Sequence, residues 1–285
     1  MKNKRKILFF GATSFAAEDL IGYLKKKYEI INVSRKKHIN CKNIKFDIKK
    51  INNSIGKINK LKNIHYIFYF SSFVPSKEKD SSMRKCLDIN VYGIIEFLKK
   101  LKLKPKKIIL ASSNSVYGNS EKIKKENDIL YPDNSYAISK YLQENIFRIY
   151  CRENMIKLIT LRIGNIYGKN LDKKRIVSKI INKIKNKVFF KTYNENDKVF
   201  NLVHTKDIGK IVYKLLTKEQ GVYNLSGQEN LSLNQIIKII SKKLNQRAYY
   251  KNINYKNKRK KNSLSVKKIK NILRIKHLIK FEDGV

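Results

Sequence analysis

The chain has 285 residues, of which 42% are hydrophobic, so it can bury a sizeable core as one large domain or two closely joined domains. A formal net charge of +43 would normally favour nucleic acid or an anionic membrane as a partner, but the 55 lysines are spread along the whole chain. We therefore expect no specific nucleic-acid binding, and only weak attraction of polyanions at low salt. The dispersed positive field would instead favour a phosphorylated substrate and cofactor.

The three cysteines, Cys41, Cys86 and Cys151, lie far apart and match no metal-ligand spacing, so no metal site is expected. Their pattern favours a reduced, cytoplasmic protein. The basic start MKNKRKILFF resembles the first part of a signal peptide, but its apolar run stops at Gly11 and is too short for one. No apolar run reaches the roughly eighteen residues of a membrane span, so none is predicted.

The first predicted elements are a strand, a tight turn and a helix. Residues 6–10 form an apolar run, GATSFAA follows at once, and EDLIGYLKKK has the apolar spacing of a helix. Gly11 permits the bend, and a helix start offers free N–H groups and a positive dipole end to a pyrophosphate. This pattern predicts a dinucleotide site with Gly11, Thr13, Ser14 and Phe15 at the cofactor.

The next predicted strand, EIINVSRKK, ends in residues that bear on the choice of cofactor. Sites that prefer NAD usually place a carboxylate here for the ribose 2′-hydroxyl, whereas the 2′-phosphate of NADP needs cationic donors. The chain has Ser34, Arg35 and Lys36, and no acid. We therefore predict NADP, with NAD as the alternative because lysine is common throughout the chain.

Tyr136 and Lys140 are four residues apart in the helix-compatible segment SYAISKYLQENIFRIY, so their side chains share one helix face. An ammonium one turn away favours the phenolate, which predicts a pair that can pass protons near neutral pH. Ser113 ends the apolar strand KIILASS, where a returning helix can bring it beside Tyr136. These groups suit interconversion of an alcohol and a carbonyl, although a tyrosine and a lysine at this spacing can also be an ordinary surface pair.

Together, FFGATSFAAEDL, SSNSVYG and YAISK resemble the extended short-chain dehydrogenase/reductase family that acts on nucleotide sugars. The resemblance covers nearly the whole chain. It implies an α/β fold with a doubly wound parallel sheet (Rossmann) and a smaller carboxy-terminal substrate-binding region. We expect residues 1–165 to form the dinucleotide-binding domain with the catalytic pair. Residues 166–285 would form mainly the substrate-binding region, with some segments returning to the first domain, and the protein would be a homodimer.

The resemblance implies that Ser113 holds the carbonyl or hydroxyl oxygen and that Tyr136 exchanges its proton. Lys140 would lower the tyrosine pKa and bind the cofactor ribose. Six further residues are implied at the cofactor, namely Asp47, Ile48, Phe70, Ser71, Ser72 and Asn90. Asp47 and Ile48, at the end of the predicted strand NIKFDI, match a pair that contacts adenine, and Asn90 matches an asparagine that supports the active-site backbone.

On the substrate side, the resemblance implies Asn114, after the catalytic serine, and Asn165, in the segment NIYG, which contacts the substrate diphosphate in relatives. Arg259 in KNKRKKN lies roughly where a family arginine binds the diphosphate, but this run can equally be a solvated basic loop. Relatives usually carry another arginine at the position of Phe200. Without it, the phosphate charge must be neutralised from elsewhere.

Dehydratases of the family carry an Asp-Glu pair directly after the catalytic serine or threonine, whereas this chain has Asn114 and Ser115, which cannot act as carboxylates. Dehydration is therefore not expected. A reductase exchanges its cofactor in every cycle, whereas an epimerase retains one cofactor, so the predicted NADP preference favours a reductase. We therefore predict an NADP(H)-dependent reductase of a keto group on a nucleotide-linked sugar. The alternative is an NAD(P)-dependent epimerase, such as a 4-epimerase.

Two non-catalytic hypotheses are also open. Departures from the family pattern at Ser14, Ala17 and Phe200 suggest a dinucleotide-binding protein without turnover, although the intact Ser, Tyr and Lys set argues against it. The high charge suggests a polyanion-binding protein, whose contacts through dispersed lysines would be screened at about 0.15 M salt.

Overall fold

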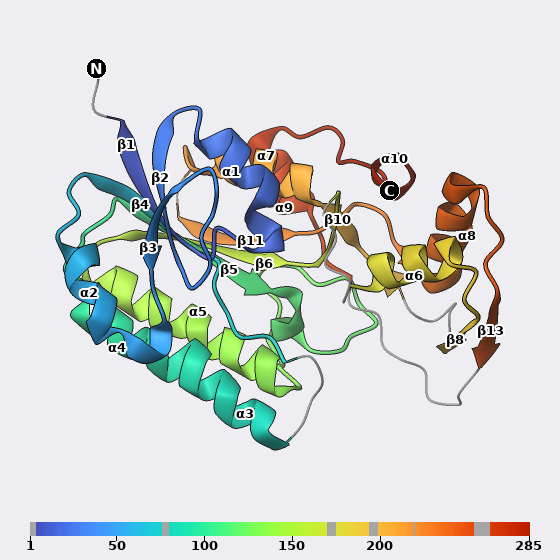
Figure 1. Ribbon diagram of the computed structural model, residues 1–285, viewed down its shortest axis with the longest axis horizontal. Helices are drawn as coiled ribbons and strands as arrows, with labels where there is room; N and C mark the ends of the chain where they lie inside the picture. Colours follow the sequence, from blue (N-terminus) through green and yellow to red (C-terminus); the bar gives the residue numbers. More distant parts are fainter. Residues whose placement is uncertain (1–3, 76–79, 170–174, 194–198, 219, 254–262) are drawn as a thin grey trace.

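The computed structural model of the protein describes residues 4–75, 80–169, 175–193, 199–218, 220–253 and 263–285 (Figure 1). Its centre is a seven-stranded sheet in which all neighbouring strands are parallel. The strands are β1 (Arg5–Phe10), β2 (Tyr28–Ser34), β3 (Lys42–Lys45), β4 (Ile64–Tyr69), β5 (Lys107–Ser113), β6 (Lys157–Ile163) and β11 (Gly221–Leu225). Most carry continuous apolar runs because helices cover the sheet on both sides.

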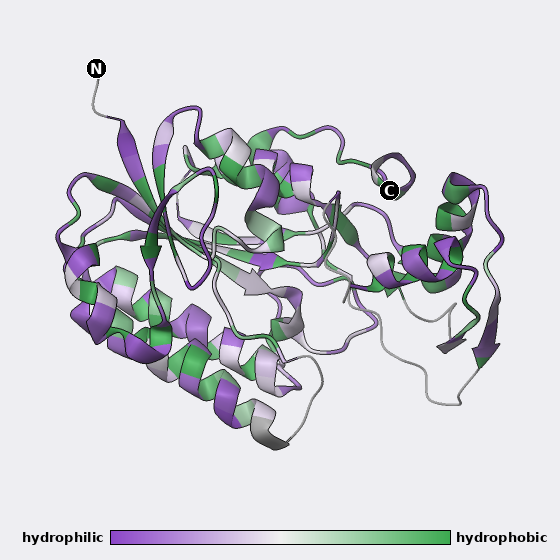
Figure 2. Ribbon diagram, in the orientation of Figure 1, coloured by the Kyte–Doolittle hydropathy of each residue, from purple (hydrophilic) through white to green (hydrophobic). Residues whose placement is uncertain are grey.

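Side chains alternate between the two faces along each strand, so each face has its own core. Ile7 and Phe9 of β1 join one buried cluster, and Leu8 and Phe10 join the other. The first face carries α1 (Glu18–Leu24), α7 (Thr205–Leu215) and α9 (Lys267–Leu273). The second carries α2 (Asn52–Asn59), α4 (Gly93–Lys100) and α5 (Ser135–Glu153), with α3 (Asp80–Leu87) beside α5. Figure 2 shows hydrophobic and hydrophilic residues alternating along these helices, as expected when one side faces a core.

A smaller lobe lies beyond the end of the sheet and has its own apolar cluster, which includes Ile180, Ile236 and Phe281 (Figure 1). Its helices are α6 (Ile176–Lys185), α8 (Leu233–Leu244) and α10 (Phe281–Gly284). Its strands pair two by two, β7 (Asn165–Tyr167) with β10 (Leu202–His204), β9 (Val199–Phe200) with β12 (Leu231–Ser232), and β8 (Phe190–Tyr193) with β13 (Tyr250–Ile253). The chain crosses between the sheet and the smaller lobe repeatedly. Along the sequence, α7, β11 and α9, which belong to the large sheet or its cover, alternate with elements of the smaller lobe.

The strand order is β11-β6-β5-β4-β1-β2-β3, which confirms the predicted doubly wound parallel sheet. The order reverses between β1 and β4, and in such sheets ligands bind in the crevice at the carboxyl ends of the strands where this reversal occurs. Gly11 follows β1 at this point and Phe70 follows β4. The sheet therefore opens its ligand crevice where the sequence predicts the cofactor.

Some element boundaries differ from the predicted ones. The strand predicted to end at Asp47 and Ile48 stops at Lys45, because Asp47 caps the short 3-10 helix η2 (Ile48–Lys50) by accepting a hydrogen bond from the Lys49 N–H. Helix α3 is joined to α4 by a π-helical turn, η3 (Asp88–Tyr92). Across the residues described, no helix has the length and apolar character needed to cross a membrane.

Candidate active site

Gly11 shapes the crevice between β1 and β4. Its φ of +81° lies in the region that favours glycine, and a Cβ at this position would stand 2.9 Å from the carbonyl carbon of Phe70 and 3.0 Å from the Ser71 nitrogen. Only a residue without a side chain therefore lets the turn after β1 approach the backbone after β4 this closely. Thr13 is exposed on the same turn.

The turn after Gly11 fits a pyrophosphate. The Ser14 N–H donates to the Gly11 carbonyl at 2.9 Å, and the chain then enters the 3-10 helix η1 (Phe15–Ala17) and α1. The Ser14 hydroxyl oxygen is buried and has no hydrogen-bond partner among the residues that the structure describes. A buried hydroxyl without a partner is costly, and a phosphate oxygen would supply the missing acceptor. The residues present therefore fit a dinucleotide cofactor at this turn.

The end of β2 presents cations. The Asn32 Nδ2 and the Ser34 hydroxyl both donate to the Lys36 carbonyl, at 2.9 and 2.5 Å, which folds the chain into a tight turn. The side chains of Arg35 and Lys36 are exposed on this turn. Asp47 lies after the neighbouring strand β3 and its carboxylate already caps η2.

Ser113 and Tyr136, which lie on different elements, are brought together. Ser113 ends β5 and caps the 3-10 helix η4 (Asn114–Tyr117), accepting from the Ser115 N–H at 3.2 Å and the Ser115 hydroxyl at 3.0 Å. Tyr136 lies in the first turn of α5, whose start is capped by the Asn134 side chain. The Ser113 side chain lies close enough to the Tyr136 phenol to lower its pKa. A hydroxyl pair of this kind can hold and protonate one oxygen atom of a substrate.

Lys140 is fully buried on α5, one turn after Tyr136. Its ammonium donates to the Ala111 carbonyl at 2.6 Å, to the Ser72 hydroxyl at 3.0 Å and to the Gln143 side-chain oxygen. These contacts join α5 to the carboxyl ends of β4 and β5. Burial lowers the pKa of Lys140 from its usual 10.5 to about 7.

Lys140 is not among the groups that lower the pKa of Tyr136 in this structure, so its expected effect stays a prediction. Burial raises the pKa of Tyr136 from 10 to about 12, and the groups that oppose the rise are Arg175 and Ser113 rather than Lys140. The physical reason is that the Lys140 ammonium turns to the strand ends, where three acceptors satisfy it. Tyr136 therefore remains protonated at neutral pH and can act as a proton donor.

Asn90 connects the cofactor side of the crevice to α5. In η3, its side chain accepts from the Phe73 N–H at 2.7 Å and donates to the Phe73 carbonyl at 2.9 Å and to the Ser139 hydroxyl at 3.0 Å. These bonds hold the backbone just after Phe70, Ser71 and Ser72. π-helical turns are frequent at functional sites, and here the turn directs the buried Asn90 toward that backbone.

The predicted substrate residues lie in different parts of the structure, and only Asn114 is adjacent to Ser113 in the chain. Asn114 directly follows Ser113, and its side-chain oxygen accepts from the Ser113 hydroxyl at 3.4 Å. Asn165 is half-buried at the start of β7. Phe200 of β9 packs against the apolar cluster of the smaller lobe. Arg259 lies outside the described residues.

Arg175 was not singled out from the sequence. It directly precedes α6, its guanidinium carbon lies 5.9 Å from the centre of the Phe15 ring, and its charge lowers the pKa of Tyr136. The structure thus brings a cation to the space between the cofactor turn and the proton donor. The one signal in the sequence was the scarcity of arginine, since 10 of the 65 basic residues are arginine.

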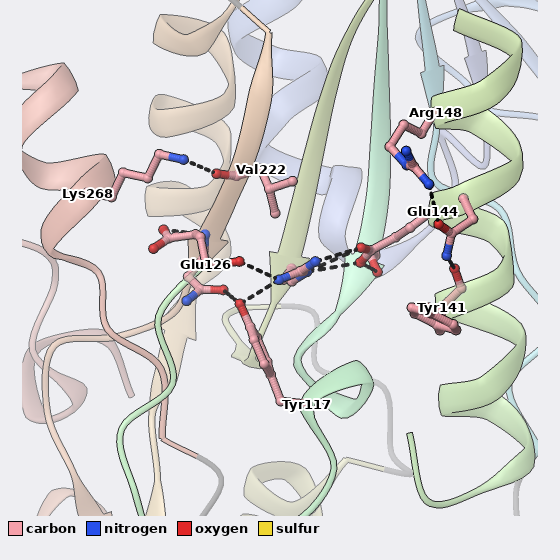
Figure 3. Close-up of polar contacts among 11 residues, drawn as sticks. Tyr117, Glu126, Tyr141, Glu144, Arg148, Val222 and Lys268 are labelled. Atoms are coloured by element: carbon pink, nitrogen blue, oxygen red, sulfur yellow. Dashed lines mark hydrogen bonds and ion pairs between the residues drawn. The ribbon is translucent and has the colours of Figure 1, made fainter. Parts of the chain in front are cut away.

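A buried ion pair beside the catalytic helix was also missed. Glu144, one turn after Lys140, accepts from Arg162 of β6, with Nη2 of Arg162 2.9 Å from Oε2 of Glu144 (Figure 3). Arg162 also donates to the Tyr117 hydroxyl at 2.8 Å, and this hydroxyl donates to Asn224 at 2.8 Å. The YAISK motif could not indicate this pair, because Arg162 comes from a separate strand.

A glycine turn at the switch point of a doubly wound sheet, beside a serine, a tyrosine and a lysine on the next strand and helix, is the arrangement of extended short-chain dehydrogenases/reductases. Residues 7–226 match the model of the NAD dependent epimerase/dehydratase family. The chain belongs to this family.

Over 185 residues the chain is 31% identical to dTDP-4-dehydro-6-deoxyglucose reductase of Escherichia coli, a match that covers 62% of this chain and 58% of the relative. Over 188 residues it is 23% identical to UDP-glucose 4-epimerase of Mycoplasma pneumoniae, covering 59% of this chain and 54% of that one. The chain thus spans somewhat over half the length of these relatives. Its fold is similar to that of UDP-glucuronic acid 4-epimerase from Bacillus cereus in complex with NAD, with a TM-score of 0.85, 19% identity and coverage of 98% and 95% of the two chains.

Proposed function

We propose that the protein is an NADP(H)-dependent reductase that acts on a keto group of a nucleotide-linked sugar, with Tyr136 as the proton donor. The observation that carries the proposal is the Tyr136 phenol, held against Ser113 beside the ligand crevice and kept protonated because burial raises its pKa to about 12. A protonated phenol suits reduction, which must deliver a proton to the new hydroxyl oxygen. Oxidation would first require a phenolate.

In this scheme the Ser113 hydroxyl donates a hydrogen bond to the carbonyl oxygen, and the Tyr136 hydroxyl delivers its proton to the same atom. When bound, the reduced nicotinamide supplies the hydride to the carbonyl carbon. Lys140 holds its positive charge behind the reacting groups and keeps the ends of β4 and β5 together through Ser72 and the Ala111 carbonyl. Lys140 would also bind the cofactor ribose, together with the backbone positioned by Asn90.

NADP is proposed over NAD because Arg35 and Lys36 are exposed at the end of β2 and no acid stands there. The structural neighbour named above binds NAD, so NAD is the alternative. The turn from Gly11 to Phe15 would hold the pyrophosphate, with the Ser14 hydroxyl as one donor. Asp47 and Ile48 would lie at the adenine.

For the substrate, we propose that Asn114 lies at the sugar and that Asn165 and Arg259 lie at the diphosphate. Phe200 cannot neutralise phosphate, and Arg175 is a candidate for this task because its charge lies close to Tyr136 and Phe15. An arginine can donate two parallel hydrogen bonds to a phosphate. We further propose that the protein is cytoplasmic and forms a homodimer. The mass of the protein in solution would test the homodimer.

The deciding experiment incubates the protein with NADPH and a panel of nucleotide-linked keto-sugars and follows both the absorbance of the reduced nicotinamide and the sugar product. A reductase consumes one NADPH for each product molecule. Interconversion of two nucleotide sugars without net loss of NADPH would overturn the proposal in favour of an epimerase, the activity named for the Mycoplasma relative. Cofactor binding without turnover of any panel member would favour a non-catalytic role.

A further inference from the structure

Glu144 is a buried carboxylate in the same helix as the proposed catalytic pair. It lies four residues after Lys140 on α5, a spacing that places two side chains on one helix face with their Cβ atoms about 5–6 Å apart. Its side chain is 10% exposed and that of Arg162 is 7% exposed. A negative charge is thus enclosed next to the buried ammonium.

Three donors hold this carboxylate in place. The Ser112 hydroxyl donates to Oε1 at 2.5 Å, Arg162 Nε lies 3.2 and 3.3 Å from the two oxygens, and Arg162 Nη2 donates to Oε2 at 2.9 Å (Figure 3). Arg162 is itself held by the Tyr117 hydroxyl at 2.8 Å and by the Glu126 carbonyl at 3.0 Å. The carboxylate therefore has one well-defined position.

Stability is a poor explanation for a pair of this kind. Removing two charges from water costs about as much as their attraction returns, and apolar residues of similar volume often do equally well. The pair does, however, place charge beside a functional group. The titratable and charged groups around the Lys140 ammonium are Tyr136 and Glu144 on α5, Arg162 of β6 behind Glu144, and the Cys86 thiol of α3 beside Tyr136. Among these, Glu144 is the group whose charge attracts the ammonium.

We propose that Glu144 is a positioning residue that acts through Lys140: its carboxylate, held by Arg162 and Ser112, is the buried countercharge that favours the ammonium form of Lys140 near neutral pH. Burial and Glu144 act in opposite directions on the pKa of Lys140, since burial lowers it and the Glu144 charge raises it. Without the carboxylate the ammonium loses its proton at lower pH. The share of Lys140 in the ammonium form near neutral pH would then fall below that of the wild type.

The test replaces Glu144 with glutamine, which keeps the shape and removes the charge. The titration of Lys140 is followed by NMR on protein containing isotope-labelled lysine, and its signal is identified by its loss in Lys140→Met. In Glu144→Gln the titration midpoint moves to lower pH by about one pH unit or more, the effect of losing a nearby opposite charge. The decline of NADPH affinity with rising pH, measured by fluorescence, moves in the same direction.

Glu153→Gln is the matched control, because Glu153 lies at the exposed end of the same helix and the variant removes the same charge. It leaves the midpoint in place. If Glu144→Gln fails to fold because Arg162 is left unpaired, the double variant Glu144→Gln/Arg162→Met removes both charges and gives a smaller shift in the same downward direction. An unchanged midpoint in the folded variant overturns the proposal, since a merely structural role would not move a titration.

The role given to Lys140 rests on the proposed function, but its titration needs neither cofactor nor sugar. A protein that reduces no keto-sugar yet shows the downward shift would overturn the reductase and leave the countercharge standing. A protein that reduces a keto-sugar but shows no shift of the Lys140 midpoint would support the reductase and overturn the countercharge.

Discussion

The proposed ligand site has a cofactor side and a catalytic side, which holds Ser113, Tyr136 and Lys140. The two sides are built differently. On the cofactor side, around the ends of β2 and β3, polar contacts join residues close in sequence, such as Ser34 with Lys36 and Asp47 with Lys49, each two positions apart. On the catalytic side they join distant ones: Lys140 and Ser72 are 68 positions apart. The first kind of contact forms wherever the local chain permits it, whereas the second exists only when the sheet is assembled.

The charges on the two sides differ in the same way. Arg35 and Lys36 are exposed to water, whereas Lys140, Glu144 and Arg162 are buried. Water and salt screen the interactions of exposed charges, whereas interactions between buried charges are screened much less. Charge on the cofactor side can therefore set a preference between ligands, while charge on the catalytic side affects stability and proton transfer. The predictions below test this contrast.

The largest effect is expected on the catalytic side for Tyr136→Phe. The variant deletes only the phenolic oxygen, so turnover falls by roughly a hundredfold to ten-thousandfold, the usual contribution of a general acid. NADPH affinity, measured by fluorescence, stays close to that of the wild type. The measurement is the steady-state rate with the keto-sugar that the wild-type protein reduces. A variant with a near wild-type rate would contradict the assignment of Tyr136 as the proton donor.

The next effect separates buried from exposed charge. Arg162→Met leaves Glu144 buried and unpaired, and the free energy of unfolding should fall by roughly 3–5 kcal/mol. Lys42→Met breaks an exposed ion pair at the starts of β2 and β3, where Lys42 Nζ lies 2.7 Å from Oε1 of Glu29 and the lysine side chain is 75% exposed. This loss should be about 1 kcal/mol or less.

Urea denaturation of both variants measures this difference. Equal losses would show that the two ion pairs are equally screened, and would remove the distinction between buried and exposed charge.

On the cofactor side, Arg35→Ala should change ligand preference rather than stability. A charge-assisted hydrogen bond to the 2′-phosphate is worth roughly 1.5–3 kcal/mol, so the ratio of NADPH to NADH affinity falls about tenfold to a hundredfold. Lys243→Ala, an exposed lysine of α8 in the smaller lobe, serves as the control for loss of general positive charge. A wild-type protein that binds both cofactors equally would sink the NADP assignment.

The smallest effect concerns pH. Lys140 has a pKa of about 7 in the folded protein against 10.5 ordinarily, so between these values the unfolded chain binds more protons than the folded one. Stability therefore rises with pH across this window, and this one group contributes about 1 kcal/mol between pH 7 and 8. In Lys140→Met this contribution is absent. Denaturation curves of both proteins at the two pH values measure it, and identical pH dependence would show that the lysine titrates elsewhere.

Much of the fold could be predicted from the sequence, because its signals are local. Apolar runs indicated the buried strands, and the turn at Gly11 could be located because a sharp bend between a strand and a helix favours glycine. The four-residue spacing placed Tyr136 and Lys140 on one face of α5. The strand ending at Ser113 was also recognisable, and the sheet brings that serine to Tyr136 as expected.

The tertiary structure alone decided the electrostatics of the site. Lys140 and Tyr136 were recognisable as a pair, but the direction of the ammonium depends on the Ala111 carbonyl and Ser72, which other strands deliver. Arg162 reaches Glu144 only because β6 packs beside the catalytic helix. A pKa depends on burial and on neighbours in space, and spacing along the chain contains neither quantity. The sequence could therefore indicate the proposed reacting groups, whereas only the assembled sheet determined their charge.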